Sequence, residues 1–216
     1  MLRIFLILLL LSSSTANSGT ETILLVGDSL SAAYGMPADA GWVALLQQRL
    51  KSEHYPYQLV NASISGDTSA SARARLPRAL DRYRPAIVIL QLGGNDGLRG
   101  LSLVELKQNL AEMIERVTGS GGSCLLLGVH LPPNYGSGYS GKFHNVYHEL
   151  ARETGTVLVP SLVDGIGTRG ELMQSDGIHP NRDAQPVIAE RVWAELQPLL
   201  EGKPARDRKN HYIPDP

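Results

Sequence analysis

Short apolar runs of strand length alternate with helix-like segments over most of this sequence. The clearest run, Ala86–Leu92, is apolar at nearly every position, is rich in β-branched residues and ends at Gly93-Gly94. A strand without a polar face cannot have one side in water, so it belongs in a sheet that is covered on both faces. The alternation of such strands with helices therefore predicts an α/β fold with a parallel sheet.

The other expected elements repeat this pattern. Strands are expected at Ile23–Val26, Gln58–Ala62, Ala86–Leu92, Ser123–Val129 and Thr156–Val159. Helices are expected at Gly41–Leu50, at Ser71–Tyr83, from a capping box at Ser102–Glu105 to about Val117, at Lys142–Glu153 and at Asp183–Leu200. Pro77 must either kink the second of these helices or lie in its first turn.

A chain of 216 residues is long enough for one domain with a full hydrophobic core. Its net charge of −1, with both signs mixed along the sequence, favours neither nucleic acid nor an anionic membrane surface as a partner. Cys124 is the only cysteine, so no disulfide can form within the chain, and its apolar surroundings in sequence indicate a buried strand thiol. We expect a monomer.

Residues 1–16 have the layout of a secretory signal peptide. Arg3 precedes the apolar run Ile4–Leu11, and Ser14-Thr15-Ala16 fits a small-x-small cleavage site. The apolar run is far shorter than the roughly 20 residues that span a bilayer, so no stable membrane insertion is expected once the signal is removed. A buried N-terminal strand is the alternative, but it leaves Arg3 unexplained. At the other end, Gly202–Pro216 carries Gly, Pro and alternating charges, which predicts a disordered tail.

Two short motifs carry chemistry. Gly27-Asp28-Ser29-Leu30 follows the first expected strand, and Asp176-Gly177-Ile178-His179 precedes the last expected helix. A serine becomes a nucleophile when a base takes its proton, and the base works best when a third group orients it. Ser29, His179 and Asp176 can supply these three functions, which favours acyl transfer by a serine hydrolase. The motif is not the Gly-x-Ser-x-Gly elbow, because Ser31 stands where the second glycine would be.

Two further loops offer hydrogen-bond donors for a developing oxyanion. Gly66 follows the second expected strand, and its backbone N–H could approach a substrate closely; an ordinary strand-to-helix turn is the alternative. Asn95 follows the third strand, where its amide could donate, or it could simply adopt a left-handed turn followed by Asp96 as a cap. Ser29, Gly66, Asn95 and His130 each follow an expected strand, where ligand sites of parallel sheets lie.

His144 and His148 have the spacing of two metal ligands on one helix. No glutamate lies between them as in His-Glu-x-x-His, and no acidic or thiol cluster is near them in the sequence. We therefore expect a solvated helix face, with a metal site as the alternative.

The four blocks around Ser29, Gly66, Asn95 and His179 resemble, in this order, those of the SGNH (GDSL-type) hydrolases. The likeness runs over residues 22–200, which are expected to form the catalytic domain. Three longer strings are similar to the bacterial periplasmic esterases of the thioesterase I, protease I and lysophospholipase type: Asn61–Thr68, Leu92–Gly100 and Asp176–Pro186.

The resemblance implies a three-layer α/β/α sandwich with a five-stranded parallel sheet of flavodoxin-like strand order. It implies that Ser29 is the nucleophile, His179 the base and Asp176 its orienter. The oxyanion hole would consist of the Ser29 and Gly66 N–H groups and the Asn95 amide. No cofactor or metal is implied, the substrates would be acyl esters, thioesters or lysophospholipids, and the enzyme would be periplasmic or secreted.

The string Val129–Gly136 is similar to the substrate-side loop of these esterases, except that arginine is expected where His130 stands. On that basis the substrate-binding residues are Leu131, Pro132, Asn134 and Tyr135. The segment 131–141 combines apolar side chains with Gly136, Gly138 and Gly141, which predicts a mobile loop over an acyl chain; an ordinary surface loop is the alternative.

Two rival functions remain open at this point. A flavodoxin-like sheet can hold a small ligand in glycine-rich loops without any chemistry. A carbohydrate O-deacetylase of the same superfamily would share the motifs but act on acetylated glycans.

Overall fold

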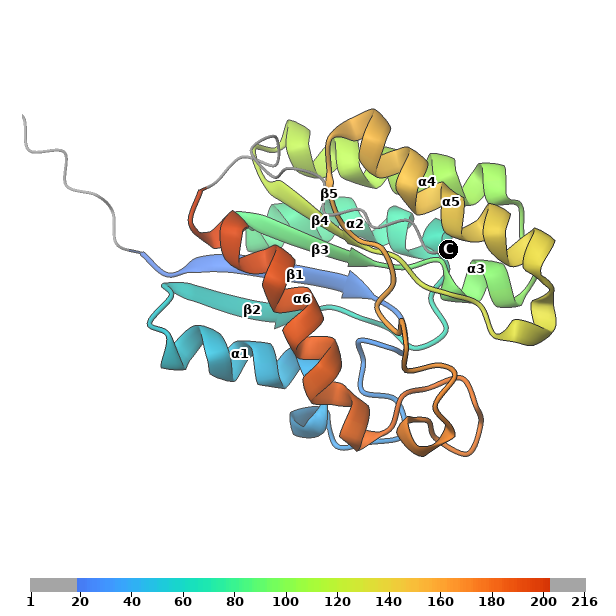
Figure 1. Ribbon diagram of the computed structural model, residues 1–216. Coiled ribbons are helices and arrows are strands. Elements are labelled where there is room, and N and C mark those ends of the chain that lie inside the picture. Colours follow the sequence, from blue (N-terminus) through green and yellow to red (C-terminus); the bar gives the residue numbers. More distant parts are fainter. Residues whose placement is uncertain (1–18, 203–216) are drawn as a thin grey trace, which may run out of the picture.

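The computed structural model describes residues 19–202, which contain a five-stranded sheet of order β2-β1-β3-β4-β5 (Figure 1). All neighbouring strands are parallel. The strands are β1 (Glu21–Gly27), β2 (Tyr57–Asn61), β3 (Ile87–Gln91), β4 (Ser123–Leu127) and β5 (Val157–Val159). This is the flavodoxin-like order, so the predicted fold class is confirmed.

Helices cover both faces of the sheet (Figure 1). One face packs against α1 (Trp42–Ser52) and α6 (Gln185–Leu200), and α6 crosses in front of the strands in Figure 1. The other face packs against α2 (Ser69–Tyr83), α4 (Leu103–Gly119) and α5 (Ser137–Thr154). Ile23 and Leu25 of β1 belong to the first core, whereas Leu24 and Val26 belong to the second. Burial on both sides explains why the central strands β1, β3 and β4 are apolar at most positions.

Cys124 lies in β4 as a buried free thiol, and burial raises its pKa to about 12. The prediction of a buried strand thiol is therefore confirmed. Within residues 19–202 no helix combines the length and apolar character needed to cross a bilayer.

The structure decides between the alternatives for Pro77 and corrects the start of one expected helix. Pro77 lies inside α2 beyond its first turn, so the first-turn alternative is wrong. The helix α5 begins at Ser137 rather than Lys142, because packing outweighs the low helix propensity of Gly138 and Gly141. Its first turns are held by Tyr139, whose hydroxyl donates to the Gly97 carbonyl at 3.2 Å. Half of the predicted mobile loop is therefore helical.

A short helix, α3 (Gly94–Leu98), occupies the segment after β3 for which a left-handed turn was one of the two alternatives. Asn95 is therefore helical and not left-handed; the left-handed residue is Gly93. The predicted signal peptide, residues 1–16, lies outside the described residues, as does the predicted tail apart from Gly202.

Candidate active site

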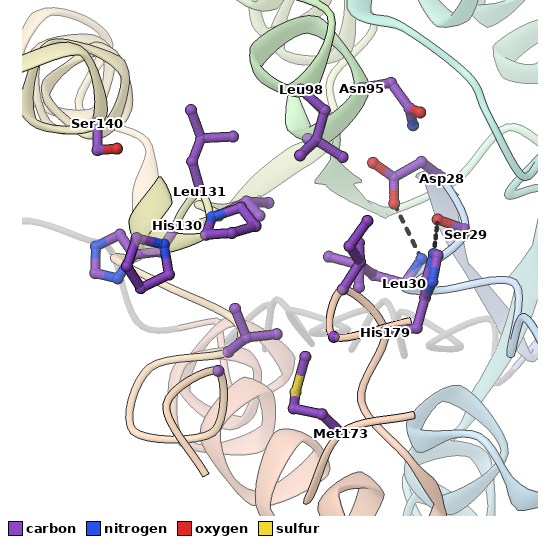
Figure 2. Close-up of a pocket in the computed structure, with 18 of the residues that line it drawn as sticks. Asp28, Ser29, Leu30, Asn95, Leu98, His130, Leu131, Ser140, Met173 and His179 are labelled. Atoms are coloured by element: carbon purple, nitrogen blue, oxygen red, sulfur yellow. Dashed lines mark hydrogen bonds between the residues drawn. The ribbon is translucent and has the colours of Figure 1, made fainter. Parts of the chain in front are cut away.

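Two segments far apart in the sequence meet beyond the carboxyl end of β1. Ser29 Oγ lies 2.8 Å from His179 Nε2, although 150 residues separate them (Figure 2). The other ring nitrogen, His179 Nδ1, lies 2.6 Å from Asp176 Oδ2. This continuous chain of hydrogen bonds from hydroxyl to imidazole to carboxylate is the arrangement that activates a serine.

The Asp176–His179 loop holds the imidazole through its own backbone. Asp176 Oδ1 accepts hydrogen bonds from the N–H groups of Ile178 and His179, at 2.9 and 3.0 Å. Partial burial of Asp176 disfavours its charge, but the bonds from the His179 amide and ring outweigh burial and lower the pKa of the carboxyl below its ordinary value. Asp176 is therefore ionised at neutral pH and can stabilise an imidazolium at His179.

Two candidate oxyanion donors converge on the same place. Gly66 adopts φ +85°, which turns the backbone after β2, and Arg99 donates to the Gly66 carbonyl at 3.0 Å. Asn95 projects from α3, and its Nδ2 donates to the Asp67 carbonyl at 3.0 Å. An amide nitrogen carries two hydrogens, so Asn95 keeps one donor for a ligand. Gly66 and Asn95 line the same cavity as Ser29 and His179.

That cavity has a volume of about 790 Å³, which is in the range that holds small-molecule ligands. Its walls come from the loops that follow all five strands and from the start of α5. Apolar side chains form much of the lining beyond Ser29 and His179: Leu30, Leu98, Val129, Leu131, Val163, Met173 and Ile178. Figure 2 shows Leu30, Leu98, Leu131 and Met173 around the cavity. The site is therefore an apolar groove with a hydrogen-bonded serine at one end.

The sequence itself connects this geometry to known proteins. Residues 25–185 match the GDSL-like lipase/acylhydrolase family. This chain belongs to that family. Esterase TesA of Pseudomonas aeruginosa is 52% identical to it over 186 residues, which cover 86% of this chain and 92% of that relative. Thioesterase 1/protease 1/lysophospholipase L1 of Escherichia coli strain K12 is 44% identical over 196 residues, 91% of this chain and 92% of that relative.

A solved structure shows the same fold. It is that of the psychrotrophic esterase EstA from Pseudoalteromonas sp., inhibited by monoethylphosphonate, and its sequence is 38% identical to this chain. The superposition has a TM-score of 0.79 and covers 84% of this GDSL hydrolase and 99% of that chain.

A buried polar network fixes the position of α3 in this GDSL hydrolase. Asp96 accepts hydrogen bonds from the Ser69 amide at 2.9 Å and the Ser69 hydroxyl at 2.6 Å. Asn109 of α4 donates to the same hydroxyl at 2.9 Å. A cap on the segment after Asp96 was one of two alternatives from the sequence; in the structure Asp96 instead caps Ser69, the first residue of α2. The network joins α2, α3 and α4 under Asn95.

We expect Asp96→Ala to lower the free energy of unfolding by about 4 kcal/mol, because it removes two hydrogen bonds to a buried charge and leaves Ser69 with unmet donors. Asp96→Asn should cost less, since its amide oxygen can still accept one bond. Urea denaturation of the three proteins measures both differences. Equal losses in the two variants would contradict the proposed capping role.

Asp28 lies buried directly below Ser29. Its Oδ1 accepts from the Leu30 amide at 3.0 Å, which shapes the turn that presents the serine. The preceding Gly27 is packed so closely that a Cβ there would lie 2.9 Å from Ser63 Oγ. Burial raises the pKa of Asp28 to about 6, against the partial opposition of the Leu30 and Gln91 hydrogen bonds.

This raised pKa predicts that Asp28 destabilises the fold as pH rises. Below about pH 4 the carboxyl is protonated in both states, whereas above pH 6 its buried charge costs the folded state about 3 kcal/mol. Asp28→Asn cannot ionise and keeps an acceptor for Leu30. The unfolding free energy of Asp28→Asn relative to wild type should therefore rise by about that amount between pH 4 and pH 8.

Urea denaturation across this pH range measures the trend, with Asp81→Asn as a control at an exposed aspartate. A difference between Asp28→Asn and wild type that stays constant with pH would show that the Asp28 carboxyl is not held in its neutral form.

The substrate-side residues predicted from the sequence divide into two groups. Leu131 and Pro132 line the cavity, but Asn134 and Tyr135 do not. Asn134 is exposed, and Tyr135 turns inward, where its hydroxyl donates to the Leu98 carbonyl at 2.9 Å. Tyr135 therefore anchors the segment to α3 rather than facing the groove.

The prediction of a solvated face at His144 and His148 is wrong. Both side chains are half-buried on α5; their Nε2 atoms lie 2.9 Å apart, and their ring centroids 4.7 Å apart. His130 stacks on His144 with ring centroids 4.1 Å apart. Burial above all, with the charges of His130 and His148, lowers the pKa of His144 to about 4. Among the residues placed by the structure, no group of three or more His, Cys, Asp or Glu side chains could hold a metal ion.

One contact of His179 could not be predicted from the sequence. The Tyr34 ring lies against the His179 ring with centroids 4.4 Å apart and an interplanar angle of 34°. Tyr34 follows Ser29 in an irregular turn, where no periodicity marks a functional residue. Its packing limits the rotation of the imidazole.

Proposed function

We propose that this chain hydrolyses acyl esters and thioesters, lysophospholipids among them, through an acyl-enzyme on Ser29. The observation that carries the proposal is the hydrogen-bonded chain Ser29–His179–Asp176 at one end of an apolar groove. The names of the relatives, esterase and thioesterase 1/protease 1/lysophospholipase L1, agree with it.

The reaction follows from the positions of these groups. His179 Nε2 takes the proton of Ser29 Oγ as the oxygen attacks the acyl carbonyl. The Ser29 and Gly66 N–H groups and the Asn95 amide stabilise the oxyanion, and Asp176 stabilises the imidazolium. His179 then protonates the leaving alcohol or thiol, and water repeats the sequence to release the acid. This chemistry needs no cofactor or metal.

The place of action is part of the proposal. Residues 1–16 would direct the chain to the bacterial periplasm or the exterior and would be removed there, and residues 22–200 would act as a monomeric catalytic domain. Because acyl-CoA is cytoplasmic, lysophospholipids and simple esters are the more fitting physiological substrates. Mass spectrometry of the mature protein tests this: a chain that begins near Asn17 supports export, and an intact Met1 contradicts it.

A fluorophosphonate probe tests the chemistry in one step. The probe should label the wild-type enzyme on the peptide that contains Ser29, and pre-incubation with a decanoyl ester should slow labelling. The Ser29→Ala variant should remain unlabelled. A wild-type protein that binds acyl esters but neither reacts with the probe nor hydrolyses them would instead be a ligand-binding module.

A substrate panel tests the acyl class. Chromogenic esters from acetyl to dodecanoyl should be cleaved with increasing kcat/KM until the groove is filled, because each buried methylene contributes about 0.8 kcal/mol. Acetylated xylan oligosaccharides should be poor substrates. Cleavage confined to acetylated glycans would favour the O-deacetylase function.

A further inference from the structure

The groove has two chemically different ends. Ser29 and His179 lie at one end, and His130 and Ser140 lie at the other, on the opposite side of the cavity drawn in Figure 2. The apolar side chains listed above lie between them. An unbranched saturated acyl chain would pack against the apolar middle of the groove but would offer no hydrogen bond at the polar end.

Two hydrogen-bonding atoms at the polar end are unsatisfied. Ser140 Oγ and His144 Nδ1 are buried, and neither has a hydrogen-bond partner within residues 19–202. They belong to consecutive turns of α5, and both residues line the groove. Both atoms are shielded from solvent, so a ligand reaches them only when the Ser140 hydroxyl or the His144 ring turns toward the groove. Because a buried polar group without a partner costs about 1–3 kcal/mol, a ligand that supplies one is then favoured there over an alkyl chain.

The histidines and the aspartate around Ser140 and His144 favour an uncharged group on the ligand. The rings of His130, His144 and His148 are stacked closely enough that a charge on one disfavours a charge on the next. The lowered pKa of His144 is consistent with a neutral ring. Asp164, from the loop after β5, lines the same groove and interacts electrostatically with His144, so its carboxylate disfavours an anionic ligand. A hydroxyl group can both donate to and accept from neutral partners of this kind.

The direction of catalysis decides which part of the substrate reaches this end. His179 must protonate the leaving group, so the alcohol lies beside its imidazole, and the acyl chain takes the groove that leads away from it. We propose that Ser140 and His144 form a subsite for a hydroxyl carried on the distal part of the acyl chain, so that this enzyme prefers hydroxyacyl esters to unsubstituted ones. The proposal rests on the esterase function proposed above.

A hydroxyl scan tests the subsite. The wild-type enzyme is given chromogenic decanoyl esters, one unsubstituted and the others with a hydroxyl moved one carbon at a time along the chain. Hydroxyls near the middle should lower kcat/KM, because they face leucines. At one or two adjacent distal positions kcat/KM should exceed that of the unsubstituted ester by about three- to tenfold, the value of one or two neutral hydrogen bonds.

Two variants test whether Ser140 and His144 cause the gain in kcat/KM for the hydroxy ester. In Ser140→Ala and in His144→Leu, the ratio of kcat/KM for the best hydroxy ester to that for the unsubstituted ester should fall below about twofold. The matched control is Asn145→Leu, an exposed position on the same helix that does not line the groove, and it should keep the wild-type ratio. Ser140→Ala removes a single oxygen, so it tests the subsite even where His144→Leu proves unstable.

The outcomes separate the two proposals. Hydrolysis of the unsubstituted ester with no gain at any hydroxyl position, or a gain that survives both variants, overturns the subsite and leaves the esterase function standing. A larger gain with an amino group than with a hydroxyl overturns it in favour of a cation site at Asp164. A gain from a hydroxyl on the alcohol portion shows that the acyl chain lies elsewhere. No hydrolysis of any ester overturns both.

Discussion

Replacing Ser29 with alanine is expected to lower kcat about a million-fold while leaving the fold intact. In the proposed mechanism the Ser29 Oγ atom makes the attack, and it is this atom that lies 2.8 Å from His179 Nε2. When members of a serine triad act as a unit, removal of the nucleophile or the base costs about as much as removal of both. His179→Ala and the double variant should therefore show losses similar to that of Ser29→Ala.

The measurement is kcat for one decanoyl ester in the three variants, with urea denaturation to verify folding. Ser52→Ala, an exposed serine at the end of α1, is the matched control and should keep wild-type turnover. Wild-type turnover in Ser29→Ala would refute the assignment of the nucleophile. A double variant that loses the product of the two single losses would show that Ser29 and His179 act independently.

The sheet and its covering layers could be predicted because strand burial leaves a direct trace in the sequence. Ile23 and Leu24 point to opposite cores, so both had to be apolar, and the same holds along β3 and β4. The meeting of Ser29, His179 and Asp176 could be predicted for a related reason, since Ser29 follows a strand and Asp176 and His179 share one short loop. Local patterns of this kind can be recognised in the sequence without knowledge of contacts between distant residues.

The features that could not be predicted depend on distant contacts. The start of α5 is held by Tyr139 reaching α3, and the role of Asp96 depends on Ser69 arriving from another helix. The spacing of His144 and His148 was visible, but their burial depends on His130 stacking from the loop after β4. Residue type alone does not tell whether such a helix face meets solvent or another segment.

The largest remaining effect is expected at Asn95, the proposed oxyanion donor. Asn95→Ala should lower kcat about a hundredfold or more with little change in KM, because its amide is proposed to bind the charge that develops in the transition state and not the ground-state carbonyl. Its hydrogen bond to the Asp67 carbonyl holds the amide in place before substrate arrives. A donor that is fixed in advance costs no reorganisation during the reaction.

The hydrogen bond from Asn95 to the Asp67 carbonyl also allows a second explanation for a loss of activity in Asn95→Ala, and the experiment must distinguish the two. If Asn95 only anchors the Asp67 loop, its removal would lower stability and raise KM through a displaced Gly66. Ser71→Ala is the matched control, because Ser71 Oγ donates to Asp67 Oδ1 at 2.8 Å and does not line the cavity. A hundredfold fall in kcat for Asn95→Ala, with Ser71→Ala losing stability but little kcat, assigns the amide to the oxyanion. A rise in KM at constant kcat in both variants would instead make Asn95 a support for the loop, and the oxyanion hole would then have to be built from backbone N–H groups alone.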